Sequence, residues 1–427
     1  MGQKICYPEA VLNRLKGRIV FKHLESPVAA VRRAGQIKLD FGSTYAANAL
    51  IGFIFAATGP VAIILSVGTR GGLSPQELAS WVFGVFFVNG LVTLLMSWRY
   101  TMPLAFGWTI PGTVLVGPAL QHLSFAEVIG AFYATSALIL VLGLSGWVKR
   151  VMAVLPMPIV MGMVAGVFLR FGLDIVRALQ SDLAIAAPMV GVFLLLSARA
   201  GWGQRMPPVI GAMLVGALAV AVSGRLNVSA LGQLTLAQPV IQAPVWSLAA
   251  MLELVVPLAI TVLVVQNGQG VAVLKNAGHA PPVNMIAVAC GVGAAVSAVF
   301  GAVSTCLTGP TNGLLTSSGE KNRHYTGALM VGVLALLFGL MAPTFTGLML
   351  AAPKEFIMVL GGLAMLRVLQ GAFVASFGAG KHSLGALVSL LVTVVDIGLF
   401  NIGAAFWGLV AGFAVSWWME RGDFQGA

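Results

Sequence analysis

Residues 101–120 read TMPLAFGWTIPGTVLVGPAL, a stretch as long and as apolar as a membrane-spanning helix but interrupted in its middle by proline and glycine. The part up to Trp108 can run extended, and the rest can form a half-helix. Pro111 suits the first turn of that helix, because its missing N–H costs nothing there, and Thr109 is predicted to cap it. A bilayer tolerates such a break only where protein or a cavity covers the freed backbone, so the stretch predicts a broken segment beside a cavity.

A second stretch, VSTCLTGPTNGLLTSSG at 303–319, has the same pattern. Thr109 and Thr308 both begin the sequence T-x-P and are 199 residues apart. Two further pairs are separated by 197 residues: Pro156 with Pro353, and Arg170 with Arg367. Two copies of about seven segments each would be inserted upside down relative to one another, as in many secondary transporters. Chance similarity between Gly- and Ala-rich apolar strings is the alternative.

The rest of the chain is equally apolar. Of its 427 residues 59% are hydrophobic and only 9% are charged, whereas a soluble domain needs roughly a quarter charged. The apolar runs do not alternate as barrel strands do, so the fold class is an all-α polytopic membrane protein. Unbroken spans are expected at the following ranges: 44–67, 78–98, 126–147, 150–170, 184–198, 207–223, 247–272, 283–302, 326–342, 355–372, 383–397 and 400–418. With the two broken segments they make about fourteen.

Positive charge sets the expected orientation. The net charge is +11, and most of the 24 Lys and Arg residues fall in the basic tail 1–40 and in alternate loops. Such residues collect on the cytoplasmic side of membrane proteins, which predicts both termini cytoplasmic and excludes nucleic acid as a partner. The tail does not read as a signal peptide. Arg170 is expected near the outer surface and Arg367 near the inner one, snorkelling to the interface, with a role in binding as the alternative.

The two predicted half-helices define an anion site. The first would run outward and the second inward, so both would begin near the midplane of the bilayer. Each helix start carries about half a positive charge and unpaired N–H groups. Two such starts facing each other can bind a carboxylate. The residues expected around it are Trp108, Thr109, Gly112, Thr113, Thr308, Gly309, Thr311 and Asn312.

Two further apolar spans contain polar interruptions. In 247–272, Gln266, Asn267 and Gln269 stand with two glycines where lipid-facing residues should be. They contact substrate or form hydrogen bonds between helices. Thr58 precedes Gly59 and Pro60 in the first span and marks another break or plain helix packing. Trp108 can stack on an aromatic ring or seal the cavity.

Acids are few in the apolar region. A proton carrier should be a buried carboxyl group, and the best candidates are Glu253 and Asp396; otherwise they are boundary residues. The histidines fall in predicted loops or at helix ends. No metal-ligand cluster, phosphate-binding loop or catalytic set is present, so neither a cofactor nor an enzyme activity is expected.

Four motifs carry a family resemblance: MPLAFGWTIPGT, VLPMPIVMGMVAG, VVQNGQGVAVL and TGPTNG. With them the chain resembles, from about 40 to 418, the bacterial benzoate:proton symporter (BenE) family, which is related in fold to the uracil/xanthine permeases and the sulfate-type anion transporters. The resemblance implies fourteen segments in a seven-plus-seven inverted repeat, with a core that moves like an elevator against a gate. It implies this division: 1–40, basic cytoplasmic tail; 41–148 and 247–345, the halves of the core; 149–225 and 346–418, the halves of the gate; 226–246, extracytoplasmic loop; 419–427, cytoplasmic tail.

The nucleobase permeases use glutamates in the eighth and tenth segments, where this chain has Gln266 or Asn267 and Asn312. That departure favours a substrate that brings its own negative charge. The hypothesis is therefore proton-coupled uptake of benzoate or a similar aromatic carboxylate across a bacterial inner membrane. A nucleobase permease of the same fold and a passive anion channel are the alternatives. The expected partners are the aromatic carboxylate, protons and the lipid bilayer, with a homodimer left open.

Overall fold

The computed structural model describes residues 23–27, 32–148, 150, 156–198, 206–225, 235–317, 319–395, 399 and 404–424. Within these ranges seven helices are long and apolar enough to cross a membrane, and six more apolar helices have 10–17 residues. Of the predicted tails 1–40 and 419–427, residues 1–22, 28–31 and 425–427 lie outside the described residues, as does the proton-carrier candidate Asp396. The predicted helical class of membrane protein is confirmed.

The first half of the chain starts with the short helix α2 and continues through the elements that carry the first broken segment. Their bounds are α2 Ala34–Asp40, α3 Ser43–Ala57, α4 Gly59–Arg70, α5 Pro75–Phe83, the π-helix η2 Gly84–Val88, α6 Asn89–Tyr100, β1 Phe106–Trp108, α7 Ile110–Ala119 and α8 Phe125–Ser145. Three helices follow: α10 Met157–Ser181, α11 Leu183–Ala198 and α13 Pro208–Val222.

The second half also contains a short strand followed by a short helix between longer helices. One long span is built from α14 Leu248–Ala250, the π-helix η4 Met251–Val255, α15 Val256–Ile260, the π-helix η5 Thr261–Gln266 and α16 Asn267–Asn276. After it come α17 Val283–Val299, β2 Thr305–Leu307, α18 Gly309–Leu315, the 3-10 turn η6 Lys321–Arg323 and α19 His324–Leu340. The chain ends with α20 Ala342–Leu350, α21 Lys354–Phe377, α22 Ser383–Val395, α23 Ala404–Met419 and η7 Arg421–Phe424.

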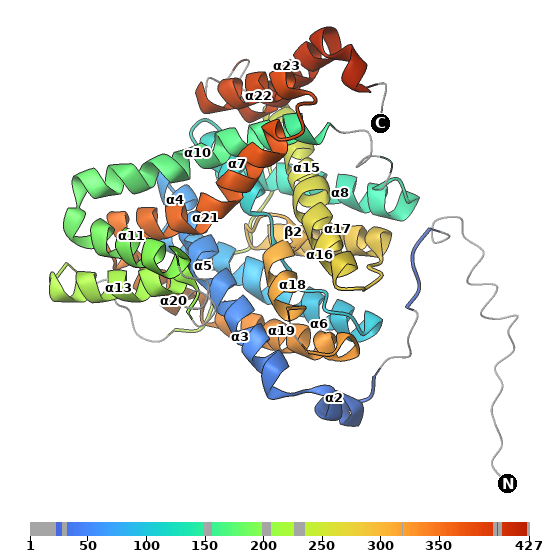
Figure 1. The fold of residues 1–427 in the computed structure, drawn as a ribbon, viewed down its shortest axis with the longest axis vertical. Helices are drawn as coiled ribbons and strands as arrows, with labels where there is room; N and C mark the ends of the chain where they lie inside the picture. The colour runs from blue at the N-terminus through green and yellow to red at the C-terminus, as the bar shows by residue number, and fades with distance from the viewer. Residues whose placement is uncertain are drawn as a thin grey trace, which may run out of the picture.

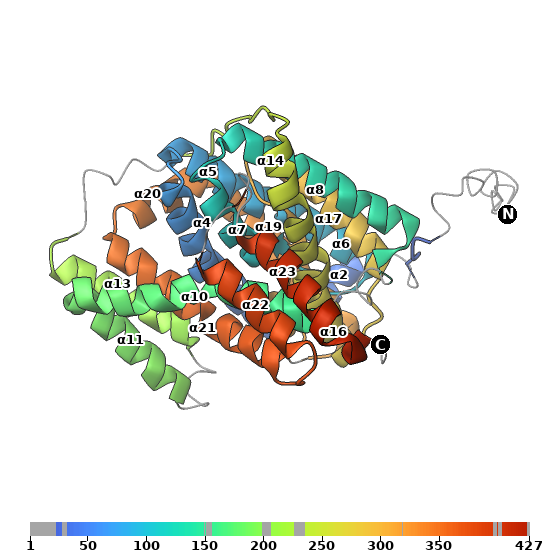
Figure 2. The ribbon, with the colours of Figure 1, turned by 90° about the horizontal axis from the view of Figure 1, so that it is seen from above.

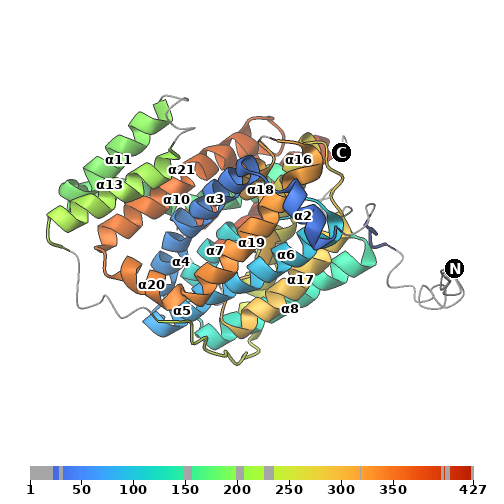
Figure 3. The same ribbon diagram turned by 90° about the horizontal axis from the view of Figure 1, so that it is seen from below.

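The helices form two groups. Figure 3 shows α10, α11, α13 and α21 gathered on one side, and α6, α8, α17 and α19 on the other. The first group packs through α10 against α21 and α22, and the second through α8 against α17 and α6 against α19. Helices α22 and α23 lie as a pair across one end, above α7 and α15 in Figure 1, and Figure 2 shows them from above.

Two expected helix ends are wrong. The helix expected at 150–170 is α10, which runs on to Ser181, and the one expected at 355–372 is α21, which runs on to Phe377. α10 continues because its buried Asp174 is paired with Arg70 at 2.6 Å and with Arg177 at 3.1 Å, so charge does not end the helix. Arg170 and Arg367 therefore lie near the middle of their helices, each thirteen residues after the first residue of a helix of 25 or 24 residues.

The first span is broken at Thr58, as one of the two interpretations of the sequence predicted. Thr58 separates α3 from α4 with φ −103° and ψ −95°, and Pro60 lies in the first turn of α4. Gly59 is required there because a Cβ atom would lie 2.2 Å from the Cβ of Ala364 on α21. The break therefore lies where α4 packs tightly against α21.

Candidate functional site

The two broken segments meet in a two-stranded antiparallel ribbon, formed by β1 and β2. Phe106 lies opposite Leu307, and Trp108 lies opposite Thr305. Beyond the strands, the N–H of Thr109 donates to Ser304 O at 3.0 Å, and that of Thr308 donates to Ala105 O at 3.1 Å. α7 and α18 thus begin at the two ends of one ribbon, with Pro111 and Pro310 in their first turns. The structure brings the two helix starts together, as the sequence predicted.

Buried side chains from neighbouring helices accept hydrogen bonds from backbone N–H groups along the outer edges of this ribbon. On the β1 side, the Thr93 hydroxyl accepts from the N–H of Phe106 at 2.8 Å, and the Ser97 hydroxyl accepts from that of Leu104 at 3.1 Å. On the β2 side, Asn267 Oδ1 accepts from the N–H of Leu307 at 2.7 Å. Sequence reasoning missed Thr93 and Ser97, although their four-residue spacing in an apolar helix puts both on one face.

Asn312 joins the ribbon to α18. Its Oδ1 accepts from the N–H of Ala105 at 3.0 Å, and its Nδ2 donates to Ala105 O at 3.0 Å and to Thr308 O at 2.6 Å. The residue is fully buried. Asn312 and Asn267 were predicted to surround the substrate, but the structure uses their amides to hold backbone.

Thr109 caps α7 as predicted. Its hydroxyl accepts from the N–H of Gly112 at 3.1 Å and donates to the Thr261 hydroxyl at 3.0 Å, and the Thr113 hydroxyl donates to Thr109 O at 3.0 Å. These groups are buried and do not line the cavity described next. Thr58 also stays outside it, with its hydroxyl donating to Phe55 O at 3.2 Å.

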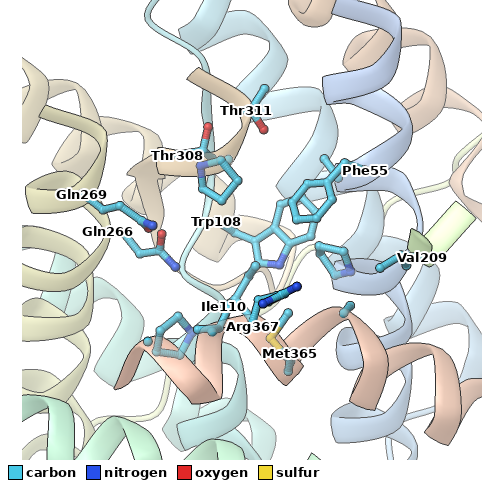
Figure 4. Close-up of a pocket in the computed structure, with 18 of the residues that line it drawn as sticks. Phe55, Trp108, Ile110, Val209, Gln266, Gln269, Thr308, Thr311, Met365 and Arg367 are labelled. Atoms are coloured by element: carbon cyan, nitrogen blue, oxygen red, sulfur yellow. The ribbon is translucent and has the colours of Figure 1, made fainter. Parts of the chain in front are cut away.

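A cavity of about 1090 Å³ lies beside the ribbon, between the two groups of helices. Five predicted site residues line it: Trp108, Gln266, Gln269, Thr308 and Thr311. Figure 4 shows these five side chains around the cavity together with Arg367. Most of the remaining wall is apolar, with Phe53, Phe86, Phe168 and Met365 among its residues, which suits an aromatic ring. Among the described residues, Arg367 is the one charged side chain in the wall.

Two side-chain amides at this cavity have no hydrogen-bond partner. Within the described part of the chain, these are the amides of Gln266 and Gln269, whereas the indole N–H of Trp108 is buried without an acceptor. Gly309 contributes indirectly, because a Cβ there would lie 2.5 Å from Gln269 Cδ and would displace that side chain. The wall thus offers two amide donor groups, and that of Gln269 lies next to the start of α18.

The expected acid Glu253 lies elsewhere, in η4. It is buried, and its Oε2 lies 2.9 Å from His122 Nε2. Glu253 and Arg170 also line a second, small cavity of about 40 Å³, bordered by α7, α10, α22 and α23. Sequence reasoning gave His122 little weight, because nothing local in the sequence places it against a residue 131 positions away.

The described residues contain no group of three or more His, Cys, Asp or Glu side chains that could hold a metal ion. A bundle of apolar helices with two broken segments meeting beside a cavity defines a polytopic membrane transport protein. A profile of the family described as benzoate membrane transport protein, BenE, matches residues 42–417. The chain belongs to this family, and it is a membrane transporter and not an enzyme.

Relatives agree with this assignment. The inner membrane protein YdcO of Escherichia coli K12 is 31% identical over 369 residues, which are 85% of this chain and 91% of that protein. The benzoate membrane transport protein of Acinetobacter baylyi is 24% identical over 382 residues, 88% of this chain and 95% of that protein.

Solved structures show the same fold at low identity. The transmembrane domain of the cyanobacterial bicarbonate transporter BicA matches with a TM-score of 0.59 and 16% identity, over 86% of this chain and 97% of that one. The murine anion transporter Slc26a9 in its inward-facing state matches with a TM-score of 0.59 and 13% identity, over 99% of this chain and 76% of that one.

Proposed function

We propose that the protein imports benzoate or a related aromatic carboxylate together with protons across the bacterial inner membrane. The cavity wall carries this proposal. Its Gln266 and Gln269 amides are free, with Gln269 beside the start of α18, its remaining surface is mainly apolar, and among the described residues it contains no carboxylate. Such a wall favours an anion with an apolar ring. The name of the Acinetobacter relative supports benzoate as the substrate.

The architecture proposed with this function is a seven-plus-seven inverted repeat of fourteen segments. The antiparallel ribbon supports it, as do Pro156 and Pro353, which stand at the N-caps of α10 and α21. The core would hold 41–148 and 247–345, the gate 149–225 and 346–418, and the core would move like an elevator against the gate. Both termini would be cytoplasmic.

In this orientation the main cavity opens to the cytoplasm. Its wall reaches Ser197, Pro207 and Ala375, which flank loops that carry the positive charge expected inside. The loop 226–246 would be extracytoplasmic. Its described part runs across helix ends: the N–H of Ala237 donates to Leu340 O at 2.7 Å, and that of Gln242 donates to Val299 O at 2.8 Å. The structure would then be inward-facing, and a homodimer in the bilayer is compatible with it.

Glu253 is the proposed proton carrier. It is buried, it lies against His122, and it is at the far end of the core from the mouth of the main cavity. Cotransport of one proton cancels the charge of a carboxylate, whose uptake an inside-negative potential otherwise opposes by about 2.3 kcal/mol per 100 mV. Additional protons would drive accumulation.

The test is uptake of labelled benzoate by proteoliposomes with an imposed pH gradient. We expect uphill uptake that an uncoupler abolishes and that salicylate, but not uracil or xanthine, inhibits. Competition by uracil would favour a nucleobase permease. A passive channel would be favoured by two observations together. Downhill benzoate flux would persist unchanged without a pH gradient, and no gradient would produce uphill uptake.

A further inference from the structure

Arg170 and Arg367 occupy matching places in the middle of two long helices. Each lies about 20 Å along its helix from the first residue, at 1.5 Å per residue, within helices about 36 Å long. Snorkelling to a membrane surface is easiest near helix ends, so a central arginine needs another reason to be there. In membrane proteins a central ionisable residue marks a ligand pathway by default.

Arg367 lies in the wall of the main cavity. Its Nη1 donates to Oε1 of Gln370 at 3.2 Å, and no carboxylate of the described residues is within ion-pair distance of it. Its side chain is exposed, and it also lines a neighbouring groove of about 410 Å³ between α11 and α21. Figure 4 shows it below Trp108, on the opposite side of the cavity wall from Thr311. A guanidinium there can attract a carboxylate and hold it with two parallel hydrogen bonds.

Arg170 is in the opposite situation. It lines the small cavity with Glu253, where α7 and η4 of the proposed core meet α10, α22 and α23 of the proposed gate. Only about 40 Å³ is available there, too little for an aromatic acid, so a substrate cannot reach this residue in the present state. One arginine is thus open to a large cavity, while the arginine at the matching place in α10 is half-buried beside a small one.

We propose that Arg367 and Arg170 are alternating carboxylate receptors of the gate, one for each side of the membrane. Arg367 captures the substrate carboxylate at the cytoplasmic side, and it is the last cation the carboxylate leaves on release. When the core moves to its outward position, the η4 and α7 surface slides away from α10, and the space that opens beside Arg170 receives the substrate from outside. This assignment rests on the proposed function.

The experiment measures the KM for benzoate separately from each face, in right-side-out cells and in inside-out membrane vesicles. The variants are Arg367→Gln, Arg367→Lys, Arg170→Gln and Arg170→Lys. The matched control is Lys354→Gln, which removes a cation from α21 outside the cavity wall. Melting temperature and elution profile of each purified variant are measured in parallel.

We expect Arg367→Gln to raise the KM from the cytoplasmic face by about tenfold and to change the KM from the outer face less than twofold. Arg170→Gln should show the reverse, each Lys variant should recover most of the loss, and the control should match the unmodified protein. If the Gln variants changed the KM equally on both faces, or not at all, the assignment would be overturned. Benzoate transport by the unmodified protein would still support the proposed function in that case. Absence of benzoate transport by the unmodified protein would overturn both.

If a Gln variant does not fold, the assignment is tested by the salt dependence of the KM, measured for the unmodified protein and for the corresponding Lys variant. Attraction by a charged receptor predicts that the KM from each face rises with ionic strength, since salt screens it. A KM that is independent of salt on both faces would also overturn the assignment.

Discussion

Replacing Asn312 by alanine should lower the stability of the protein and leave its affinity for substrate nearly intact. The side chain forms three hydrogen bonds to backbone, and its Oδ1 accepts from the N–H of the fully buried Ala105. Ala105 O keeps two other donors, the N–H and hydroxyl of Thr308, whereas the buried Ala105 N–H and the part-buried Thr308 O each lose the partner that Asn312 provides. An unsatisfied buried donor costs about 1–3 kcal/mol, so we expect about 2 kcal/mol of destabilisation.

The assay is a thermal melt of the purified protein in detergent, paired with benzoate titration of the intrinsic tryptophan fluorescence. Asn312→Ala should lower the melting temperature by a few degrees and change the Kd less than threefold. The matched variant is Thr311→Val, at the residue before Asn312. This substitution removes a hydroxyl at the cavity and keeps the shape of the side chain. It should leave the melting temperature unchanged and weaken binding by roughly three- to tenfold, as expected for one hydrogen bond.

The reverse pattern would refute this reasoning. If Asn312→Ala melted like the unmodified protein but no longer bound benzoate, its amide would contact substrate directly and the ribbon would not need it.

Three further predictions concern the contact between α4 and α21, proton coupling and a buried histidine pair. Gly59→Val should reduce transport more than tenfold, because a Cβ would overlap Ala364, while Gly35→Ala, with open space around it, should transport normally in the same vesicle assay. Glu253→Gln should abolish uphill uptake driven by a pH gradient but keep benzoate counterflow, and retained uphill uptake would exclude Glu253 as the carrier. Burial and the nearby His324 lower the pKa of His279 from 6.5 to about 4, so its contribution to stability is present above pH 6.5 and is lost as pH falls toward 4. The melting temperature should therefore fall more steeply between pH 7 and 4.5 in the unmodified protein than in His279→Gln, and parallel curves would contradict this.

Local sequence signals predicted the parts of the fold that local chemistry determines. The apolar runs gave the spans, and the T-x-P pattern gave both breaks because proline and a capping threonine act within one helical turn. The cap on α7 formed as expected. α10 exceeded its predicted end because the partner that neutralises Asp174, Arg70, is 104 residues away in the sequence.

The same distinction explains the site. Trp108, Gln266, Gln269, Thr308 and Thr311 line the cavity, and the depth of the breaks predicted that they would. The roles of Asn267 and Asn312 depend on how β1 and β2 pair, and no local sequence pattern predicts that pairing. The far wall of the cavity, with Phe168, Met365 and Arg367, comes from α10 and α21, and only the packing of these helices puts it there.

The motif Gln266-Asn267-Gly268-Gln269-Gly270 shows why its positions are not interchangeable. Gln266 and Gln269 are three residues apart, so they share one helical face, and that face lines the cavity. Asn267 and Gly270 share the adjacent face, where Asn267 binds the N–H of Leu307 and where a Cβ on residue 270 would lie 2.8 Å from the Leu307 side chain. One face therefore fixes the position of the ribbon, and the other presents two free amides at a depth that the ribbon determines. The proposed substrate contact at Gln266 would be precise only because Asn267 holds the strand beside it, so variants of Asn267 should lose ribbon stability first and affinity second.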